Sequence, residues 1–354
     1  MRQIKLLTKH NEEANYIRKE YNTVKPPTVQ DVEIINQIIN DDIFIEGVSI
    51  RGWRSTHEDS HIIEVDGDNM LFVVFDGHGG DWVANYCASH YADILFNTEE
   101  YKREDYKEAF IVTNRLMDEK IYNESKEEML NYAKTKITKK LLLFRHRGSV
   151  INRTKFHHSD ECGCTCCAVL VTPNEIITSN IGDSKAMIMG VNSISSLNRE
   201  HKVSELDERE RISKTKYTII NDRIEGILNV SRAFGDFKYK DMENGNQDEY
   251  GIISIPEIGI MKRNQKYNII IGCDGLWDCY NELDVRNYII SFYSCHELPS
   301  YYMFENEKRN RMYKLITNVD QSCAFNLGMS CIADNSFINE TCGYDNVTIL
   351  MASC

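Results

Sequence analysis

Acidic residues directly follow apolar, strand-like runs in this chain, and this pattern limits the folds open to it. Residues 71–75 run into Asp76, and residues 269–273 run into Asp274. Further acidic residues lie at the edges of strand-like segments or in a short acidic motif: Glu58, Asp59, Asp183, Asp278 and Asp345. A single Asp-Gly pair is an ordinary turn signal. The repetition instead favours a fold that gathers several strand ends in one place.

Gathered carboxylates would need cations. Two unit charges about 4 Å apart repel by about 4 kcal/mol at an effective dielectric near 20. Oxygen ligands select hard ions such as Mg²⁺ or Mn²⁺, and two such ions can activate a water molecule. Arg54, beside two of these acids, has the planar fork that grips a phosphate. If the strand ends converge, the pattern therefore indicates metal-assisted hydrolysis of a phosphate.

Strand-like segments come in runs, with helical segments between the runs. This order predicts an α+β fold with stacked sheets flanked by helices, rather than regular βαβ repetition. Residues 66–69 between two strands predict a hairpin turn, although Asp66 and Asp68 also begin like a calcium loop. Helical spacing predicts a helix at residues 32–39. The expected strands are 43–53, 61–65, 70–75, 168–171, 175–180, 185–189, 268–272 and 346–351, and the expected helices are 81–97, 103–133, 205–214 and 282–318.

Composition narrows the class of protein. The chain of 354 residues has 42% hydrophobic and 27% charged residues, which is typical of a globular protein. Its net charge of −13 disfavours a nucleic-acid binder. We expect no membrane span and no export signal, and hence a cytoplasmic or nuclear protein with reduced thiols. The cluster at residues 162–167 is read as buried core cysteines, with a zinc site as the alternative.

Residues 1–40 are expected to be an N-terminal extension, and residues 41–354 one domain with two long insertions. The first insertion, 134–158, has eight basic and no acidic residues. It is either a solvated loop or a docking segment for an acidic or phosphorylated partner. The second, at 286–342, is either regulatory or a solvated loop.

Six ordered motifs resemble those of the protein phosphatase 2C family of metal-dependent serine/threonine phosphatases. They lie at residues 52–59, 75–80, 182–186, 230–236, 273–278 and 345–348. The resemblance covers nearly the whole chain from about residue 43. It implies a four-layer α/β/β/α sandwich, in which two antiparallel sheets are flanked by helices. It also implies two Mg²⁺ or Mn²⁺ ions, a weaker third ion, phosphorylated protein substrates and a monomer.

The resemblance also implies roles for residues. The metal ligands would be Asp76, Gly77 (through its carbonyl), Asp274 and Asp345, with Asp183 and Asp278 at the third metal. The catalytic residues would be Arg54 on the phosphate, Glu58 on metal-bound waters and His78 as general acid. Supporting residues would be Asp59, Thr165 and Asn346, the last orienting Asp345. Arg232 is expected to be an ion-pair partner rather than a substrate contact.

The implied mechanism is direct attack by a metal-bridging water, without a phosphoenzyme. In two places the sequence departs from the family's motifs near the site. The strand before the site has cysteines where the family has small hydroxyl residues, which predicts sensitivity to oxidation. The expected Gly-Gly of the flap is replaced at residues 214–216 by Lys-Thr-Lys, so substrate preference cannot be carried over. The alternative functions are a pseudophosphatase that keeps the fold as a binding module and a hormone co-receptor.

Overall fold

The chain forms two compact units. In the computed structural model, the described residues are 32–38, 43–143, 161–190, 193–243, 245–246, 249–295, 322–332 and 343–353. The terminal unit comprises Met1–His57 and Gly272–Ser353, and the central unit comprises Glu58–Ile271. Most of the segments 134–158 and 286–342, and nearly all of 1–40, lie outside the described residues. The predicted single domain with its extension and insertions therefore stays a prediction.

Three antiparallel strands, adjacent in one sheet, belong to the terminal unit. They are β1 (Val32–Ile38), β2 (Phe44–Ile50) and β16 (Val347–Ser353). β2 is the middle strand, with Ile50 opposite Val32 on one side and Val347 on the other. The helix predicted at 32–39 is wrong. Its β-branched residues suit a half-buried strand, and pairing along the whole of β2 outweighs the helical spacing.

Helices accompany these strands in the terminal unit. They are α6 (Asp274–Trp277), α7 (Glu282–Cys295) and α9 (Cys323–Ser330). A Cβ at Gly328 in α9 would approach Val48 Cγ1 to 2.6 Å, so this glycine lets the helix lie close to β2. Beneath the helices, Glu46 of β2 is buried and accepts hydrogen bonds from Tyr293, Ser322 and the backbone of Cys323.

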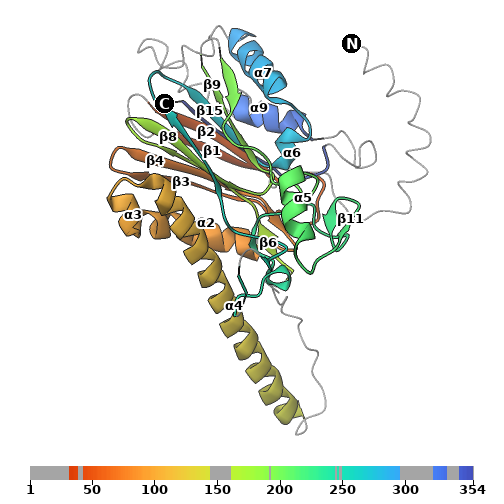
Figure 1. Ribbon diagram of the computed structural model, residues 1–354. Coiled ribbons are helices and arrows are strands. Elements are labelled where there is room, and N and C mark those ends of the chain that lie inside the picture. The colour runs from red at the N-terminus through yellow and green to blue at the C-terminus, as the bar shows by residue number, and fades with distance from the viewer. Residues whose placement is uncertain are drawn as a thin grey trace, which may run out of the picture. The chain divides into compact units, whose positions relative to one another are not determined.

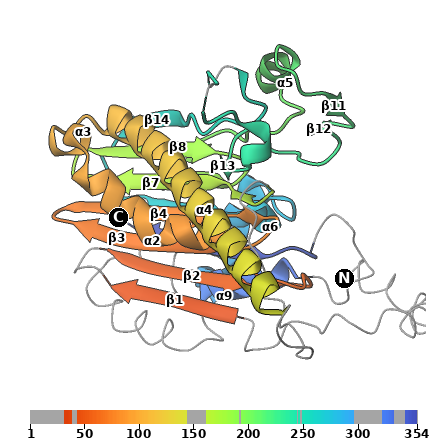
Figure 2. The same cartoon turned by 90° about the horizontal axis from the view of Figure 1, so that it is seen from below.

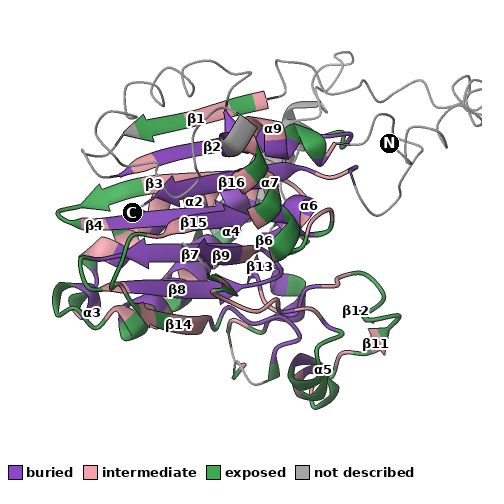
Figure 3. Cartoon of the chain, turned by 90° about the horizontal axis from the view of Figure 1, so that it is seen from above, coloured by how far each residue is buried: buried purple, intermediate pink, exposed green. Residues whose placement is uncertain are grey.

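The central unit is built on a five-stranded antiparallel sheet in the order β14-β8-β7-β4-β3. The strands are β3 (Ser60–Asp66), β4 (Asn69–Phe75), β7 (Cys166–Val171), β8 (Glu175–Ile181) and β14 (Glu257–Lys262). Gly67, with φ of +60°, makes the predicted hairpin turn between β3 and β4. The three inner strands β4, β7 and β8 are almost wholly buried, as Figure 3 shows.

Two helices pack on one face of this sheet, as Figure 2 shows: α2 (Trp82–Asn97) and α4 (Tyr106–Leu143), with the short α3 (Glu99–Lys102) between them. Leu71, Val73 and Phe75 of β4 form the core with α2 and α4. α4 is the long helix that extends away from the sheet in Figure 1. It continues ten residues into the expected basic insertion, whose remaining residues lie outside the described part.

The central unit also holds further strands and helices. They are β5 (Gly77–His78), β6 (Gly163–Cys164), β9 (Lys185–Met189), β10 (Ile194–Ser196), α5 (Leu206–Ser213), β11 (Ile219–Ile220), β12 (Arg223–Ile224), β13 (Phe234–Gly235), the 3₁₀ turn η2 (Phe237–Tyr239) and β15 (Asn268–Gly272). β5, β6 and β13 form a small antiparallel sheet with β6 in the middle.

The cysteine cluster is part of the core. Cys162, Cys164 and Cys166 pack within the core between the sheet and α2, whereas the Cys167 thiol is directed to Asn198. Burial raises the pKa of all four thiols, that of Cys162 to about 12. Thiols in this state are poor metal ligands and poor nucleophiles. The core interpretation is therefore favoured over a zinc site, and the raised pKa values argue against the predicted sensitivity to oxidation.

Candidate metal centre

Asp76 lies at the end of β4, where the sequence pattern predicts it. Its backbone N–H donates to Thr165 Oγ1 at 3.2 Å, and the Thr165 N–H donates to the Asp76 carbonyl at 2.8 Å. Thr165 is buried, and its hydroxyl also bonds the Ser184 hydroxyl at 2.9 Å. These bonds of Thr165, which was predicted to be a supporting residue, fix the backbone at Asp76. The hydrogen bond between Ser184 and Thr165 was not predicted from the sequence.

Two further carboxylates of the central unit lie close to Asp76. A carboxylate oxygen of Asp59, and one of the buried Asp183, each lie within 4.8 Å of an Asp76 oxygen. At such separations the carboxylates repel by several kcal/mol at an effective dielectric near 20. A cation offsets this repulsion, and a donor set made only of oxygens suits Mg²⁺ or Mn²⁺. The residues of this unit therefore fit the metal that the sequence pattern implies.

Gly77 follows Asp76 and has space only for a hydrogen. A Cβ at this position would lie 2.2 Å from the Glu58 carbonyl oxygen. The close approach holds Glu58 beside the loop, where its carboxylate accepts the Gly80 N–H at 3.1 Å. The segment that carries Glu58 is thus packed directly against the segment 77–80. No other residue type fits at position 77 without moving the main chain.

His78 is paired with a carboxylate that was not identified from the sequence. Its Nε2 lies 2.7 Å from Oδ2 of Asp236, and its side chain is 25% exposed. Burial acts to lower the pKa of His78, but the charge and hydrogen bond of Asp236 more than offset it, so the pKa is raised. A raised pKa favours the protonated imidazole that a general acid needs. In the sequence, the only sign of this pairing was the position of Asp236 at the end of the motif 230–236.

In the terminal unit, Arg54 and Asp345 form an ion pair at 2.5 Å, with half of the arginine side chain exposed. The guanidinium also lies 5.7 Å from the centre of the Tyr344 ring. Asn346 was expected to orient Asp345. Its backbone N–H donates to Asp345 Oδ1 at 2.8 Å, while its side chain bonds the carbonyls of Arg51 and Thr56 at 2.6 and 3.2 Å. Asn346 therefore ties the Arg54 loop to the start of β16 as well.

Asp274 and Asp278 lie at the two ends of α6, which is one turn long. Asp274 is the first residue of the helix, and Asp278 caps its C-terminus. A Cβ at Gly275 would lie 2.0 Å from the Asn346 carbonyl, so this glycine brings α6 against the start of β16. The terminal unit thus holds Arg54, Asp274, Asp278 and Asp345 on neighbouring backbone segments.

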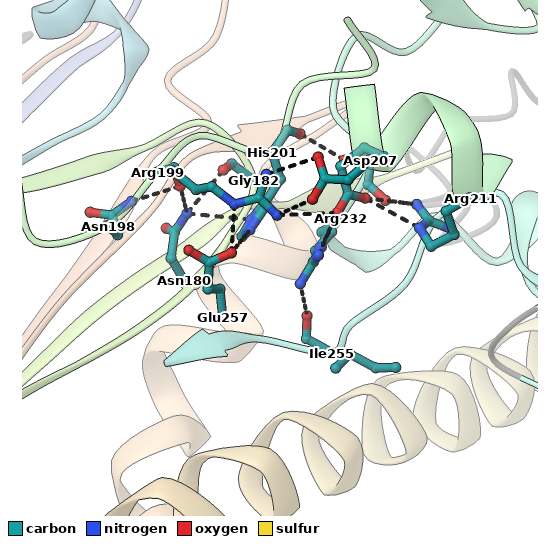
Figure 4. A network of polar contacts seen from close by, with 12 residues as sticks. Asn180, Gly182, Asn198, Arg199, His201, Asp207, Arg211, Arg232, Ile255 and Glu257 are labelled. Atoms are coloured by element: carbon teal, nitrogen blue, oxygen red, sulfur yellow. Dashed lines mark hydrogen bonds and ion pairs between the residues drawn. The ribbon is translucent and has the colours of Figure 1, made fainter. Parts of the chain in front are cut away.

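Arg232 is an ion-pair partner, as expected, within the polar network of Figure 4. Its Nε donates to the buried carboxylate of Glu208 at 2.8 Å, and Arg211 bonds the same carboxylate at 3.1 Å. Burial acts to raise the pKa of Glu208, but the two arginines outweigh it and lower the pKa. The network fixes α5. In place of the expected glycines, Lys214 caps α5 and pairs with Glu210 at 2.9 Å.

Comparison with known proteins agrees with the resemblance seen in the sequence motifs. A family model described as protein phosphatase 2C matches residues 45–310. "Probable protein phosphatase 2C 11" of Oryza sativa is 30% identical over 269 residues, which covers 71% of this chain and 74% of that protein. "Probable protein phosphatase 2C 2" of Paramecium tetraurelia is 30% identical over 68% of this chain and 75% of its own length.

A solved structure has the same fold. The structure of a phosphatase from a pathogenic strain of Toxoplasma gondii aligns with 91% of this chain, and the alignment covers 94% of the Toxoplasma chain. The TM-score is 0.58 at 18% sequence identity. Antiparallel sheets combined with helices are found in both units, so the predicted α+β class is confirmed.

Proposed function

This chain belongs to the protein phosphatase 2C family, and from this premise we propose that it removes phosphate from phosphoserine and phosphothreonine with bound Mg²⁺ or Mn²⁺. The family makes it a protein serine/threonine phosphatase that acts on phosphorylated proteins. The observation that carries the metal dependence is the approach of Asp59 and Asp183 to within 4.8 Å of Asp76. A cation offsets the repulsion among oxygen donors that lie so close together.

We assign two ions to four ligands: Asp76, Gly77 through its carbonyl, Asp274 and Asp345. Asp183 and Asp278 are assigned to a weaker third ion. When bound, the ions would lower the pKa of a water molecule, which attacks phosphorus. Their positive charge would offset the negative charge of the phosphate. The rigid backbone around Asp76, with its two bonds to Thr165, supports the first assignment.

Three side chains complete the reaction. Arg54 binds the phosphate as a fork, consistent with its exposed guanidinium. Glu58 holds water, consistent with its place beside Gly77 and Gly80. His78 donates a proton to the departing serine or threonine oxygen, consistent with its raised pKa. Attack is direct, and no residue of the chain becomes phosphorylated.

The chain is expected to work as a monomer in the cytoplasm or nucleus, and nucleic acid is not among the expected partners. In the part of the chain that the structure describes, none of the helices is both apolar enough and long enough to cross a bilayer.

Phosphate release from a phosphothreonine peptide and from p-nitrophenyl phosphate tests the proposal. We expect release with Mn²⁺ or Mg²⁺ and none with excess EDTA. Folded chain that stays inactive with either metal would favour a pseudophosphatase. Release that survives EDTA would contradict the metal dependence.

A further inference from the structure

The contact between His78 and Asp236 is made by three adjacent short strands. In the small sheet, His78 of β5 lies opposite Gly163 of β6, and Gly163 lies opposite Gly235 of β13. Asp236 directly follows β13. Residues 158 positions apart are therefore brought to hydrogen-bond distance by backbone pairing through β6.

Gly163 leaves the space in which the two side chains meet. A Cβ at this position would lie 2.3 Å from Asp236 Oδ2 and 2.7 Å from His78 Nε2. Both distances are shorter than a non-bonded contact allows. The side chains of His78 and Asp236 thus meet directly above a glycine, and any larger residue there would push them apart.

Asp236 is held in an unusual conformation. Its φ of +52° and ψ of +40° are left-handed, which is uncommon for a residue other than glycine. Its N–H donates to the Cys162 carbonyl at 3.0 Å, and the residue is 1% exposed. Among the described residues, His78 provides the one hydrogen bond to its carboxylate, and Oδ1 is buried without a partner. A carboxylate that is buried, lies on strained backbone and bonds only His78 among the described residues indicates that its function is to hold His78.

A buried ion pair braces the same strand. Asp118 of α4 accepts the Gly235 N–H at 3.0 Å and the Lys240 Nζ at 2.7 Å. Lys240 also donates to the Ala233 carbonyl at 2.9 Å. The backbone on both sides of Asp236 is therefore tied to α4, which limits movement of the carboxylate relative to β6.

We propose that Asp236 is a positioning residue, which binds Nε2 of His78 and so presents Nδ1 to the oxygen of the departing serine or threonine. As the phosphorus–oxygen bond breaks, the Nδ1 proton moves to that oxygen and leaves a neutral imidazole whose Nε2–H still bonds Asp236. This role presupposes the proposed function. It parallels the way carboxylates orient histidines at other catalytic sites.

The leaving group distinguishes this role from a purely structural one. A serine or threonine oxygen is a poor leaving group that needs a proton, whereas nitrophenolate departs without one. General acid catalysis contributes about 10²–10⁴-fold. We therefore expect Asp236→Asn to lower kcat for a phosphothreonine peptide by about 10²-fold, and to lower kcat for p-nitrophenyl phosphate far less.

A double-mutant cycle gives the second readout. His78→Gln should show the same dependence on leaving group, and adding Asp236→Asn to it should cause little further loss, because Asp236 acts through His78. Equal losses on both substrates, additive losses in the double variant, or no loss would each overturn the role of Asp236. Wild-type chain inactive on both substrates with Mn²⁺ would instead contradict the proposed function.

Gly163→Ala tests the pair without changing either side chain, should Asp236→Asn fail to fold. The added methyl should separate His78 from Asp236 and reduce phosphopeptide hydrolysis selectively. Lys107→Ala, at an exposed position of α4, is the control for an alanine substitution. A folded Gly163→Ala variant that treats both substrates like the wild type would overturn the proposal.

Discussion

At the scale of residues, sequence could identify acids at strand ends but not every partner they have. The run 71–75 followed by Asp76 is local, so the strand and the residue at which it ends could be predicted directly from the sequence. The pairing of His78 with Asp236 depends on three strands distant in sequence, and no local pattern encodes it. For the same reason, the turn at Gly67 was predicted, whereas the contact of Thr165 with Ser184 was not.

Arg54→Ala should weaken phosphate binding. Loss of a charge-assisted contact of about 1.5–3 kcal/mol should raise KM for a phosphothreonine peptide about 10- to 100-fold, and steady-state kinetics measures this. Arg54→Lys should recover only part of it, since a lysine lacks the fork. Arg115→Ala is a matched control, because Arg115 is also 52% exposed and paired with a carboxylate. An unchanged KM in Arg54→Ala would contradict the assignment.

The buried thiols should react slowly. With its pKa raised to about 12, Cys162 forms little thiolate at neutral pH, and its reactivity should increase only at strongly alkaline pH. The half-buried Cys279 should be alkylated before Cys162. Brief iodoacetamide treatment and peptide mass spectrometry can compare the two, with chain unfolded in urea as the control. Equal labelling rates in the folded chain would show that the core is open to the reagent.

At the scale of elements, sequence patterns located most of the longer strands and helices of the described chain. Alternation and apolar runs correctly indicated β2, β3, β4, β7, β8 and β9, because these strands are long or deeply buried. β1 was missed because it is half-buried and its spacing also fits a helix. The two-residue strands β5, β6 and β13 could not be predicted from the sequence, because such short elements are defined only by their pairing with other strands.

Lys240→Met should strongly destabilise the central unit. It leaves Asp118 charged and buried, and breaking a buried pair costs about 3–5 kcal/mol in the free energy of unfolding measured with urea. Lys126→Met is the control, because its pair with Glu243 is exposed and contributes little to stability. Adding Asp118→Asn should recover part of the loss. Equal effects of the two lysine substitutions would contradict the burial of the Asp118–Lys240 pair.

Glu46 should make the terminal unit sensitive to pH. Burial, opposed by its hydrogen bonds, raises the pKa of Glu46 above the ordinary 4.5. Its contribution to stability is therefore complete below that ordinary value and is lost as pH rises through the raised one.

Melting temperatures measured from about pH 4 to about pH 8 test this pH dependence. The Tm of Glu46→Gln should fall less with rising pH than that of the wild type. The exposed Glu64→Gln provides the control. Parallel curves for wild type and Glu46→Gln would show that Glu46 is not the group responsible.

At the scale of the whole molecule, the ordered motifs predicted the family, because they extend along nearly the whole chain. The order of strand-like and helical segments predicted the α+β class. The charge of −13 includes carboxylates such as Asp59, Asp76 and Asp183, which gather where a cation is expected. The roles of the basic segment 134–158 and of residues 286–342 could not be predicted, since charge and length alone do not select a partner.

The central claim is that bound metal is required for phosphate release. The most direct measurement is the rate of release from a phosphothreonine peptide as Mn²⁺ is added to chain freed of metal by EDTA. Wild type and Asp68→Asn, which alters an exposed turn, should be inactive without Mn²⁺ and recover together. Asp76→Asn should remain at least about 10²-fold slower at every Mn²⁺ concentration. Full activity without metal, or in Asp76→Asn, would contradict the account.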